Sequence, residues 1–394
     1  MKKFFFMLVS IFLVVFVTFR LINLYYDHAT NKYYDEIGKT LSFVKNKGLI
    51  LQEKALERND NISIYGSSEL AGVIIPTHPD NFFNSKRDGF QVNLIGTGYC
   101  QSIIHAINFA ALGDKLKNKK IVLILSPQWF TDKGLTAAQF DMNISELQFY
   151  QVFHNNNIDK SLKLRVTSRV NLISTSSTVS NNIKFYSYLY SKNNIFSRVA
   201  LITLKPYYDL RYNLLIIKDK INSYNILKEY KNKIEVLKAS NKKIDWDKEL
   251  TDADTIAKAQ TTNNNYGIIN DYFTKYVQKR LISSKDSYSS LSYTNSPEYD
   301  DLKLLLDVCK KDGIKPLIIG VPVHGQWYDY CGFPKERRAE YYNKVKAIIS
   351  PYGFAFEDLS KYEYESYFLK DVMHLGWKGW LQVDKSIDKY YNEN

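Results

Sequence analysis

Cysteine, histidine and long apolar segments are all scarce in this sequence of 394 residues. The three cysteines, Cys100, Cys309 and Cys331, form neither a disulfide framework nor a metal-binding spacing, so we expect them to be packed interior residues. The six histidines show no zinc-binding pattern either. We therefore expect no metal site and no cofactor.

The charge balance is strongly positive. A formal net charge of +12 attracts polyanions, which include nucleic acid, anionic lipid and phosphate-rich wall polymers. No basic nucleic-acid-binding motif is present, and the exported location inferred below argues further against nucleic acid. A solvated, lysine-rich surface explains the same charge without any partner. Hydrophobic residues at 45% and charged residues at 24% are typical of a folded globular protein.

One long apolar segment lies at the N-terminus, and no second segment is long enough to span a membrane. Residues 4–19 are almost entirely apolar, and the run continues past Arg20 to Leu24, close to the ~20 residues that cross a bilayer. Lys2 and Lys3 precede it and favour a cytoplasmic N-terminus. A cleaved signal peptide would need small residues near the end of the run, and residues 17–21 (VTFRL) offer no such site. We predict a single-pass cell-membrane anchor over 1–24 with an extracellular remainder.

The rest of the chain divides into two further parts. Residues 25–58 are charged and amphipathic and predict a helical stalk. Residues 59–394 form the predicted extracytoplasmic domain, interrupted at about 141–286 by a helical insertion or lid. Outside the insertion, strand-like and helix-like runs alternate, which predicts an α/β fold with a parallel sheet. The expected strands are 61–65, 90–95, 120–125, 314–321 and 354–356, and the expected helices are 100–112, 297–311, 336–349 and 377–391.

A candidate nucleophile lies in the segment Gly66-Ser67-Ser68-Glu69, directly after the first predicted strand. A nucleophilic serine needs a base that accepts its proton and donors that stabilise an oxyanion. Backbone N–H groups at the start of a helix are such donors. The alternative interpretation is that Ser67 or Ser68 only caps the next helix.

A candidate base lies near the C-terminus, in Asp371-Val372-Met373-His374. At this spacing the carboxylate of Asp371 can hold the imidazole of His374 from behind and select its tautomer for proton transfer. His324, after the fourth predicted strand, is the main rival base. A packed or capping histidine beside a tryptophan-rich segment is the alternative that involves no catalysis.

An early serine, a late Asp-x-x-His and a discontinuous α/β core resemble the SGNH hydrolase superfamily. This resemblance implies a three-layer α/β/α fold, with Ser68, Asp371 and His374 as catalytic residues and Gly98 as an oxyanion glycine. The superfamily's Gly-x-Asn-Asp block is absent from this chain. Gln128, after the third strand, is the candidate for the missing amide donor, and Ser67 is a further candidate for the oxyanion or substrate site.

Several motifs together narrow the resemblance to the DltD family, the membrane-anchored components of teichoic acid D-alanylation in Gram-positive bacteria. The resemblance covers nearly the whole chain and is weakest in the helical middle. Its motifs are 66–70 (GSSEL), Gly98 with 101–105 (QSIIH), 126–130 (SPQWF), 325–330 (GQWYDY) and 371–377 (DVMHLGW).

The resemblance implies transfer of D-alanine, as an ester, to lipoteichoic acid on the outer face of the membrane. It also implies as partners a membrane-bound O-acyltransferase of the same pathway and a small transmembrane peptide that assists it. Three aromatics beside the motifs, Trp129, Trp327 and Trp377, are candidates for a cleft wall that excludes water, with interior packing as the alternative. Two other functions stay open. One is an extracytoplasmic esterase or thioesterase with water as acceptor, and the other is a non-catalytic scaffold of the D-alanylation complex.

Overall fold

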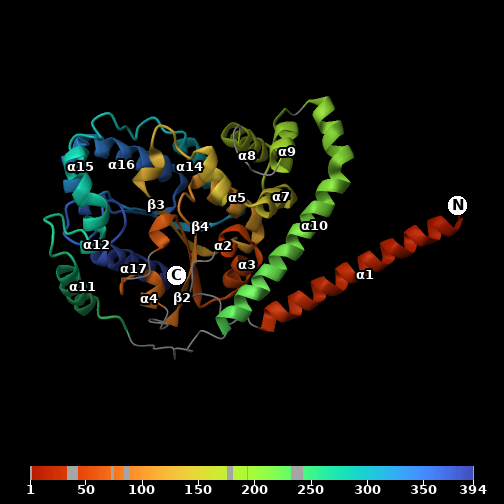
Figure 1. Cartoon of the computed structure of the whole chain (residues 1–394), viewed down its shortest axis with the longest axis horizontal. Coiled ribbons are helices and arrows are strands. Elements are labelled where there is room, and N and C mark those ends of the chain that lie inside the picture. Colours follow the sequence, from red (N-terminus) through yellow and green to blue (C-terminus); the bar gives the residue numbers. More distant parts are fainter. Residues whose placement is uncertain are drawn as a thin grey trace.

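The computed structural model describes the chain except for residues 1, 33–42, 72–74, 84–88, 175–180, 193, 232–242 and 394. Five parallel strands form one sheet of order β2-β1-β3-β4-β5 (Figure 1). The predicted α/β fold with a parallel sheet is therefore confirmed, and each strand overlaps a predicted one. The strands are β1 (Asn61–Tyr65), β2 (Gln91–Ile95), β3 (Lys120–Leu125), β4 (Lys315–Gly320) and β5 (Ala355–Asp358).

Helices make up most of the remaining described structure. The N-terminal helices are α1 (Lys2–Lys32), α2 (Phe43–Lys47), α3 (Ile50–Glu57), α4 (Pro79–Phe83) and α5 (Ser102–Leu112). Those between β3 and β4 are α6 (Ala137–Asn143), α7 (Glu146–His154), α8 (Lys160–Ile173), α9 (Asn181–Lys192), α10 (Ile195–Lys231), α11 (Trp246–Gln260), α12 (Asn270–Tyr272), α13 (Leu281–Ser284) and α14 (Glu298–Asp312). The C-terminal helices are α15 (Gly325–Tyr330), α16 (Lys335–Ile349) and α17 (Trp377–Asn392).

Helices cover both faces of the sheet, so the body has three layers. Successive strand residues point to opposite faces and divide between two apolar cores, as Ile64 and Tyr65 of β1 do. One core joins the sheet to α5, α7 and α14, and the other joins it to α4 and α17. Residues Ile121–Leu125 of β3 are buried throughout, because a central parallel strand is covered on both sides.

The predicted helical insertion does not form one separate lid. Helix α7 packs on α5, and α8 packs on α9 and α14, whereas α11 packs against α17 on the other side of the sheet. Its later part reaches the C-terminal loop, where the N–H of Ile269 donates to the carbonyl of Lys370 at 2.9 Å. The insertion therefore contributes to both helical layers, and the boundaries 141–286 stay a prediction.

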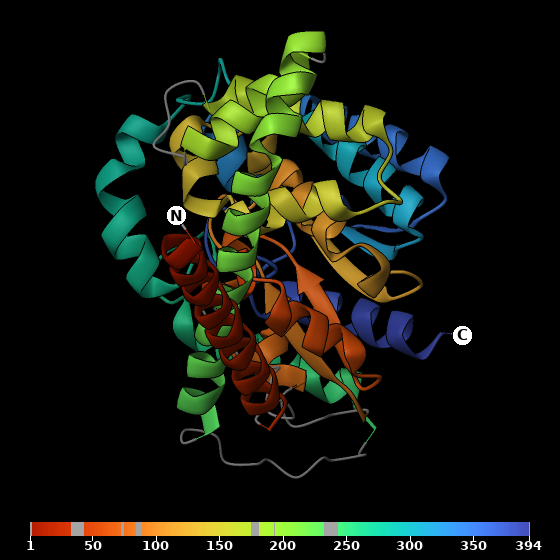
Figure 2. The ribbon, with the colours of Figure 1, turned by 90° about the vertical axis from the view of Figure 1, so that its right-hand side faces the viewer.

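The N-terminal region differs from a simple anchor followed by a stalk. Helix α1 runs without a break across the predicted boundary at residue 24 and projects from the body beside α10 (Figures 1 and 2). An ion pair of 2.7 Å between Asp27 of α1 and Lys220 of α10 joins the two helices. Part of the predicted stalk, 33–42, lies outside the described residues. Helices α2 and α3 belong to the body instead, since buried Lys45 donates to Asn93 of β2 at 3.0 Å.

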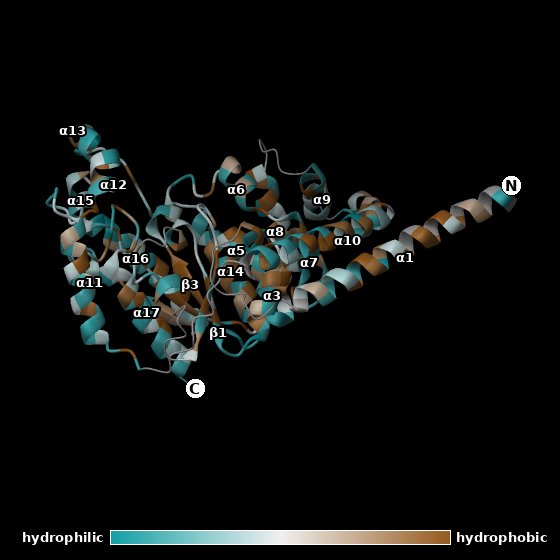
Figure 3. Ribbon diagram, turned by 60° about the horizontal axis from the view of Figure 1, so that its bottom comes forward, coloured by the Kyte–Doolittle hydropathy of each residue, from teal (hydrophilic) through white to brown (hydrophobic). Residues whose placement is uncertain are grey.

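Several turns of α1 are coloured as apolar in Figure 3, and the side chains of Phe6, Val14 and Leu21 are exposed. Within the described residues, no helix combines the length and the apolar character that a membrane crossing requires.

The strand order determines where a site can form. After β1 the chain first adds β2 on one side and later β3 on the other, so the direction of the crossovers reverses between β1 and β3. In open parallel sheets, ligands bind beyond the carboxyl ends of the strands at such a point. Gly66 and the serines that follow it lie at the carboxyl end of β1.

Candidate active site

Ser68 begins a short 3₁₀ turn, Ser68–Leu70, that follows β1. Ser68 is partly exposed, whereas Ser67 is buried. The side chain of Ser67 does not cap the turn and instead donates to the carbonyl of Thr97 at 3.3 Å. The tight turn therefore directs the two neighbouring hydroxyls to different places, and only that of Ser68 is near a base.

That base is His374. Its Nε2 lies 3.0 Å from the Ser68 hydroxyl oxygen. Its Nδ1 lies 2.9 Å and 3.1 Å from the two carboxylate oxygens of Asp371. The structure thus brings together the three residues that the sequence singled out, in the order serine, imidazole and carboxylate that base-assisted nucleophilic attack requires.

The backbone of the C-terminal loop orients the Asp371 carboxylate. One oxygen accepts the N–H groups of Met373 at 2.9 Å and His374 at 2.8 Å. Asp371 is 2% exposed, so these bonds and the imidazole replace the water that a charged carboxylate loses on burial. Burial tends to raise the pKa of Asp371, but the His374 hydrogen bond and charge and the two N–H groups outweigh it and lower that pKa.

The same contacts act on His374 in the opposite sense. Burial favours the neutral imidazole, but the hydrogen bond and negative charge of Asp371 outweigh it, with a smaller contribution from the charge of Glu69, and the pKa of His374 is raised above its usual 6.5. A raised pKa makes the imidazole a better proton acceptor as long as the pH keeps it neutral.

The rival base, His324, is fully engaged elsewhere. Its Nδ1 accepts the N–H of Trp327 at 3.3 Å and so caps α15, and its Nε2 lies 2.8 Å from the carbonyl oxygen of Tyr266. Burial lowers its pKa. His324 is a packed capping residue, which was the structural alternative for a histidine in this part of the chain.

A glycine-containing loop after β2 lies against Ser68. A β-carbon on Gly98 would lie 4.0 Å from that of Ser68, so the Gly98 backbone runs directly beside the serine. Two residues earlier, Gly96 has a φ of +146°, and a β-carbon there would overlap the carbonyl oxygen of Gly66. Only glycine allows the loops after β1 and β2 to approach this closely. The predicted role of Gly98 as an oxyanion donor stays a prediction.

The amide of Gln128 lies between Ser126 and the C-terminal loop. Its oxygen accepts the hydroxyl of Ser126, and its nitrogen is 3.5 Å from the carbonyl oxygen of Met373. The side chain therefore contacts the loop that presents His374, and its predicted role as an amide donor stays a prediction. The N–H of Ser67 is already bonded to the Glu69 carboxylate at 2.5 Å.

The three tryptophans occupy interior positions. Trp377 is fully buried in the core under α17, which makes it a packing residue rather than a cleft wall. Trp327 is 5% exposed and packs edge-on against Tyr266 at 5.6 Å between ring centroids. Trp129 is 4% exposed, and the centre of its ring lies 6.2 Å from that of His105. Large aromatic side chains next to a motif are held by the same core that holds the motif.

Three supporting residues were not given roles from the sequence. Buried Glu69 bonds the N–H of Ser67 and adds negative charge near His374, while burial raises the pKa of Glu69 itself. His105 lies 3.1 Å from the carbonyl oxygen of Gly66. Asn143 donates to the carbonyl of Gly98 at 2.9 Å. The spacing of Glu69 and His105 within the motifs was the available signal, whereas nothing around Asn143 marked it.

The candidate site combines a hydroxyl, an imidazole and a carboxylate. Within the described ranges, no group of three or more histidine, cysteine or carboxylate side chains is arranged to hold a metal ion. Acyl transfer from an ester or thioester to a hydroxyl or to water uses a serine, an imidazole and a carboxylate in this arrangement.

Comparison with known proteins identifies the family. A profile described as DltD protein matches residues 38–392. Protein DltD of Bacillus subtilis (strain 168) is 36% identical over 362 residues, covering 92% of this chain and 90% of that protein. Protein DltD of Staphylococcus aureus (strain NCTC 8325 / PS 47) is 34% identical over 345 residues, covering 87% and 84%. Protein DltD of Lacticaseibacillus rhamnosus is 28% identical over 351 residues, covering 86% and 79%. This chain belongs to the DltD family.

Proposed function

We propose that this protein transfers D-alanyl groups to lipoteichoic acid through an ester on Ser68. Family membership supports a role in teichoic acid D-alanylation. The observation that carries the catalytic part is the 3.0 Å contact of the Ser68 hydroxyl with His374, whose other nitrogen contacts Asp371. A scaffold has no need of a serine whose hydroxyl is paired with an oriented imidazole.

The reaction proceeds in two halves. In the first, the Ser68 oxygen attacks the carbonyl carbon of a D-alanyl donor, its proton passes to Nε2 of His374, and the leaving group departs with that proton. In the second, Nε2 takes the proton of an acceptor hydroxyl, whose oxygen attacks the Ser68 ester. The proton then returns to Ser68, and the product is the D-alanyl ester of the polymer. The Gly98 backbone, held by Asn143, stabilises the oxyanion formed in each half.

The location proposed is the outer face of the cell membrane, with α1 as the anchor and the N-terminus in the cytoplasm. The apolar run 4–19, the preceding Lys2 and Lys3, and the exposed apolar side chains of Phe6 and Val14 support it. A three-layer fold of the SGNH type, a membrane-bound O-acyltransferase that supplies the acyl group, and a small assisting transmembrane peptide belong to the same proposal.

The test is complementation of cells that lack this protein, with the D-alanine ester content of their teichoic acid as the readout. Ser68→Ala, expressed at the wild-type level in the membrane, is expected to leave the esters at the level of uncomplemented cells. Ser360→Ala is the matched control, because Ser360 also begins a 3₁₀ turn after a strand, and its N–H is bonded to the carboxylate of Asp358 at 2.9 Å. Full restoration by Ser68→Ala would refute the proposed acyl-serine.

A further inference from the structure

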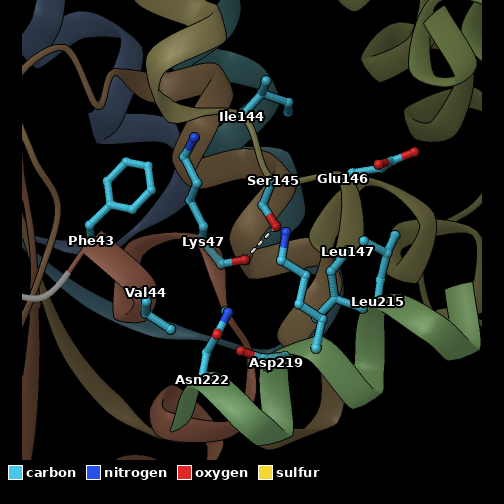
Figure 4. A pocket seen from close by; sticks show the side chains of 12 residues that line it. Phe43, Val44, Lys47, Ile144, Ser145, Glu146, Leu147, Leu215, Asp219 and Asn222 are labelled. Atoms are coloured by element: carbon cyan, nitrogen blue, oxygen red, sulfur yellow. Dashed lines mark hydrogen bonds between the residues drawn. The ribbon is translucent and has the colours of Figure 1, made fainter. Parts of the chain in front are cut away.

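A pocket of about 230 Å³ lies between α2, the connection from α6 to α7, and α10 (Figure 4). A cavity of about 150 Å³ accommodates a benzene ring, so this one has room for a small polar group with a short carbon chain. Phe43 and Lys218 at its edge are exposed, which leaves the pocket open to solvent. None of the triad residues lines it.

Two lysines supply its charge. The ammonium of Lys47 lies 4.4 Å from the centre of the Phe43 ring, and Lys218 extends from α10 into the same pocket. Within the described parts of the chain, neither lysine forms a salt bridge. Burial lowers the pKa of Lys47, and the charge of Lys218 lowers it further, against the opposing influence of Cys100 and Asp141. Both cations belong to the lining of the same pocket.

The carboxylates in the lining are already engaged. Asp219 accepts the N–H groups of Leu49 at 2.9 Å and Ile50 at 3.1 Å, at the start of α3. Glu146 pairs with Arg211 at 2.8 Å and points away from the centre of the pocket in Figure 4. The net charge that the lining offers a ligand is therefore positive, which favours a small anion.

The remaining lining is largely apolar, with Val44, Ile144, Leu147 and Leu215 around the hydroxyl of Ser145. A free phosphate ion has no carbon atoms that could contact these apolar side chains. A phosphate ester with a short carbon backbone, such as a glycerol phosphate unit, matches both the two cations and the apolar sides.

The pocket shares a hydrogen-bond network with the Gly98 loop. The side chain of Asn46, next to Lys47, donates to that of Asn143 at 3.3 Å, and Cys100 lies 3.1 Å from the oxygens of both asparagines. Asn143, next to Ile144 of the lining, bonds the carbonyl of Gly98 at 2.9 Å. One pair of side chains therefore connects the pocket to the loop beside Ser68.

We propose that this pocket binds a glycerol phosphate unit through Lys47 and Lys218 and thereby places an anionic chain next to the Gly98 loop. Two sources share this chemistry, the backbone of the acceptor polymer and the headgroup of phosphatidylglycerol. The polymer as source rests on the proposed function, whereas the pocket's affinity for glycerol phosphate does not.

The experiment measures binding of a fluorescent glycerol phosphate hexamer to the full-length protein in phosphatidylcholine nanodiscs, by anisotropy at 50 mM salt. Lys47→Gln and Lys218→Gln are each expected to weaken binding about fivefold, and the double variant about twentyfold, since each removes one screened ion pair. Lys205→Gln is the matched control, because Lys205 is also on α10 but pairs with Asp209. Its affinity is expected to match that of the wild type.

The outcomes separate the possible sources. Lysine-dependent binding of the hexamer assigns the pocket to the polymer. Lysine-dependent binding only of phosphatidylglycerol vesicles, relative to phosphatidylcholine vesicles, assigns it to the lipid headgroup. Equal affinity of the wild type and both single variants, or an equal loss in Lys205→Gln, would overturn the proposal. The same binding measurement in Ser68→Ala separates this proposal from the proposed function, because the pocket should bind the hexamer in that variant even though Ser68 is absent.

Discussion

Replacing Asp371 with asparagine separates the two tasks of this carboxylate. One of its oxygens accepts the N–H groups of Met373 and His374, and the other lies 2.9 Å from Nδ1 of His374. An asparagine keeps the first task only if its carbonyl oxygen faces the two N–H groups. Its NH₂ group then faces Nδ1, and because NH₂ only donates, Nδ1 must become an acceptor. The imidazole proton moves to Nε2, which can no longer accept the proton of Ser68.

The loss expected is large because the wrong tautomer is present in nearly every molecule. A histidine held in the wrong tautomer in a triad slows acyl transfer by a factor of about 10³ to 10⁴. At about 1.36 kcal/mol per tenfold change, this raises the barrier by about 4 to 5.4 kcal/mol. The fold should survive, since the volume and the two backbone hydrogen bonds are retained.

The assay is the second-order rate of Ser68 labelling by a fluorophosphonate, which needs the nucleophile and base but no natural substrate. Circular dichroism and a thermal melt establish that the variant is folded. Asp358→Asn is the control, because Asp358 also accepts a backbone N–H, that of Ser360 at 2.9 Å, without contacting the triad. A folded Asp371→Asn protein that labels within tenfold of the wild-type rate would refute this account of the triad.

Three further results are expected. The rate of Ser68 labelling should fall as the pH drops through a midpoint above 6.5, because Asp371 raises the pKa of His374 and the protonated imidazole accepts no proton. The pH–rate profile measures this midpoint, and a value below 6.5 would contradict the expectation. Gly96→Ala should lower the free energy of unfolding in urea by about 3–5 kcal/mol. Gly353 has a φ of +70° and no atom within 4 Å of an added β-carbon, so Gly353→Ala should lower it by only about 1–2 kcal/mol. Equal losses would show that the overlap at Gly96 is easily relieved. Arg338→Met should lower the free energy of unfolding in urea at pH 7 by about 3–5 kcal/mol, because the buried carboxylate of Glu363, which Arg338 bonds at 2.9 Å, loses its cation. A loss below 1 kcal/mol would mean that water or other groups replace the arginine.

Local patterns in the sequence predicted the elements of the sheet. The run KIVLIL is continuous and apolar because β3 is covered on both faces, so its burial can be predicted from the residue types alone. The three residues of the candidate triad were predicted together from the resemblance to the SGNH superfamily, which rests on an early serine after the first strand and on Asp371 and His374 three apart. The family motifs extended this to Gly98, which does lie beside Ser68.

Tertiary packing decided what these patterns left open. The local pattern allowed a helix cap at Ser67 or Ser68. The turn after β1 instead places the Ser67 hydroxyl at the carbonyl of Thr97 and the Ser68 hydroxyl at His374. His324 and His374 were comparable bases until the chain fold engaged both nitrogens of the first.

The stalk shows the same limit. Its amphipathic pattern predicts a helix but not a partner, and the burial of Lys45 against Asn93 depends on a strand 48 residues away. Asn143 supports the Gly98 loop from a contact 45 residues distant. The sequence by itself determined the strands, the Asp371–His374 pair and the apolar N-terminal run, because these depend on neighbouring residues. The tertiary structure alone decided how His324 is engaged and which side chains support the Gly98 loop, because those contacts join segments that are far apart in the chain.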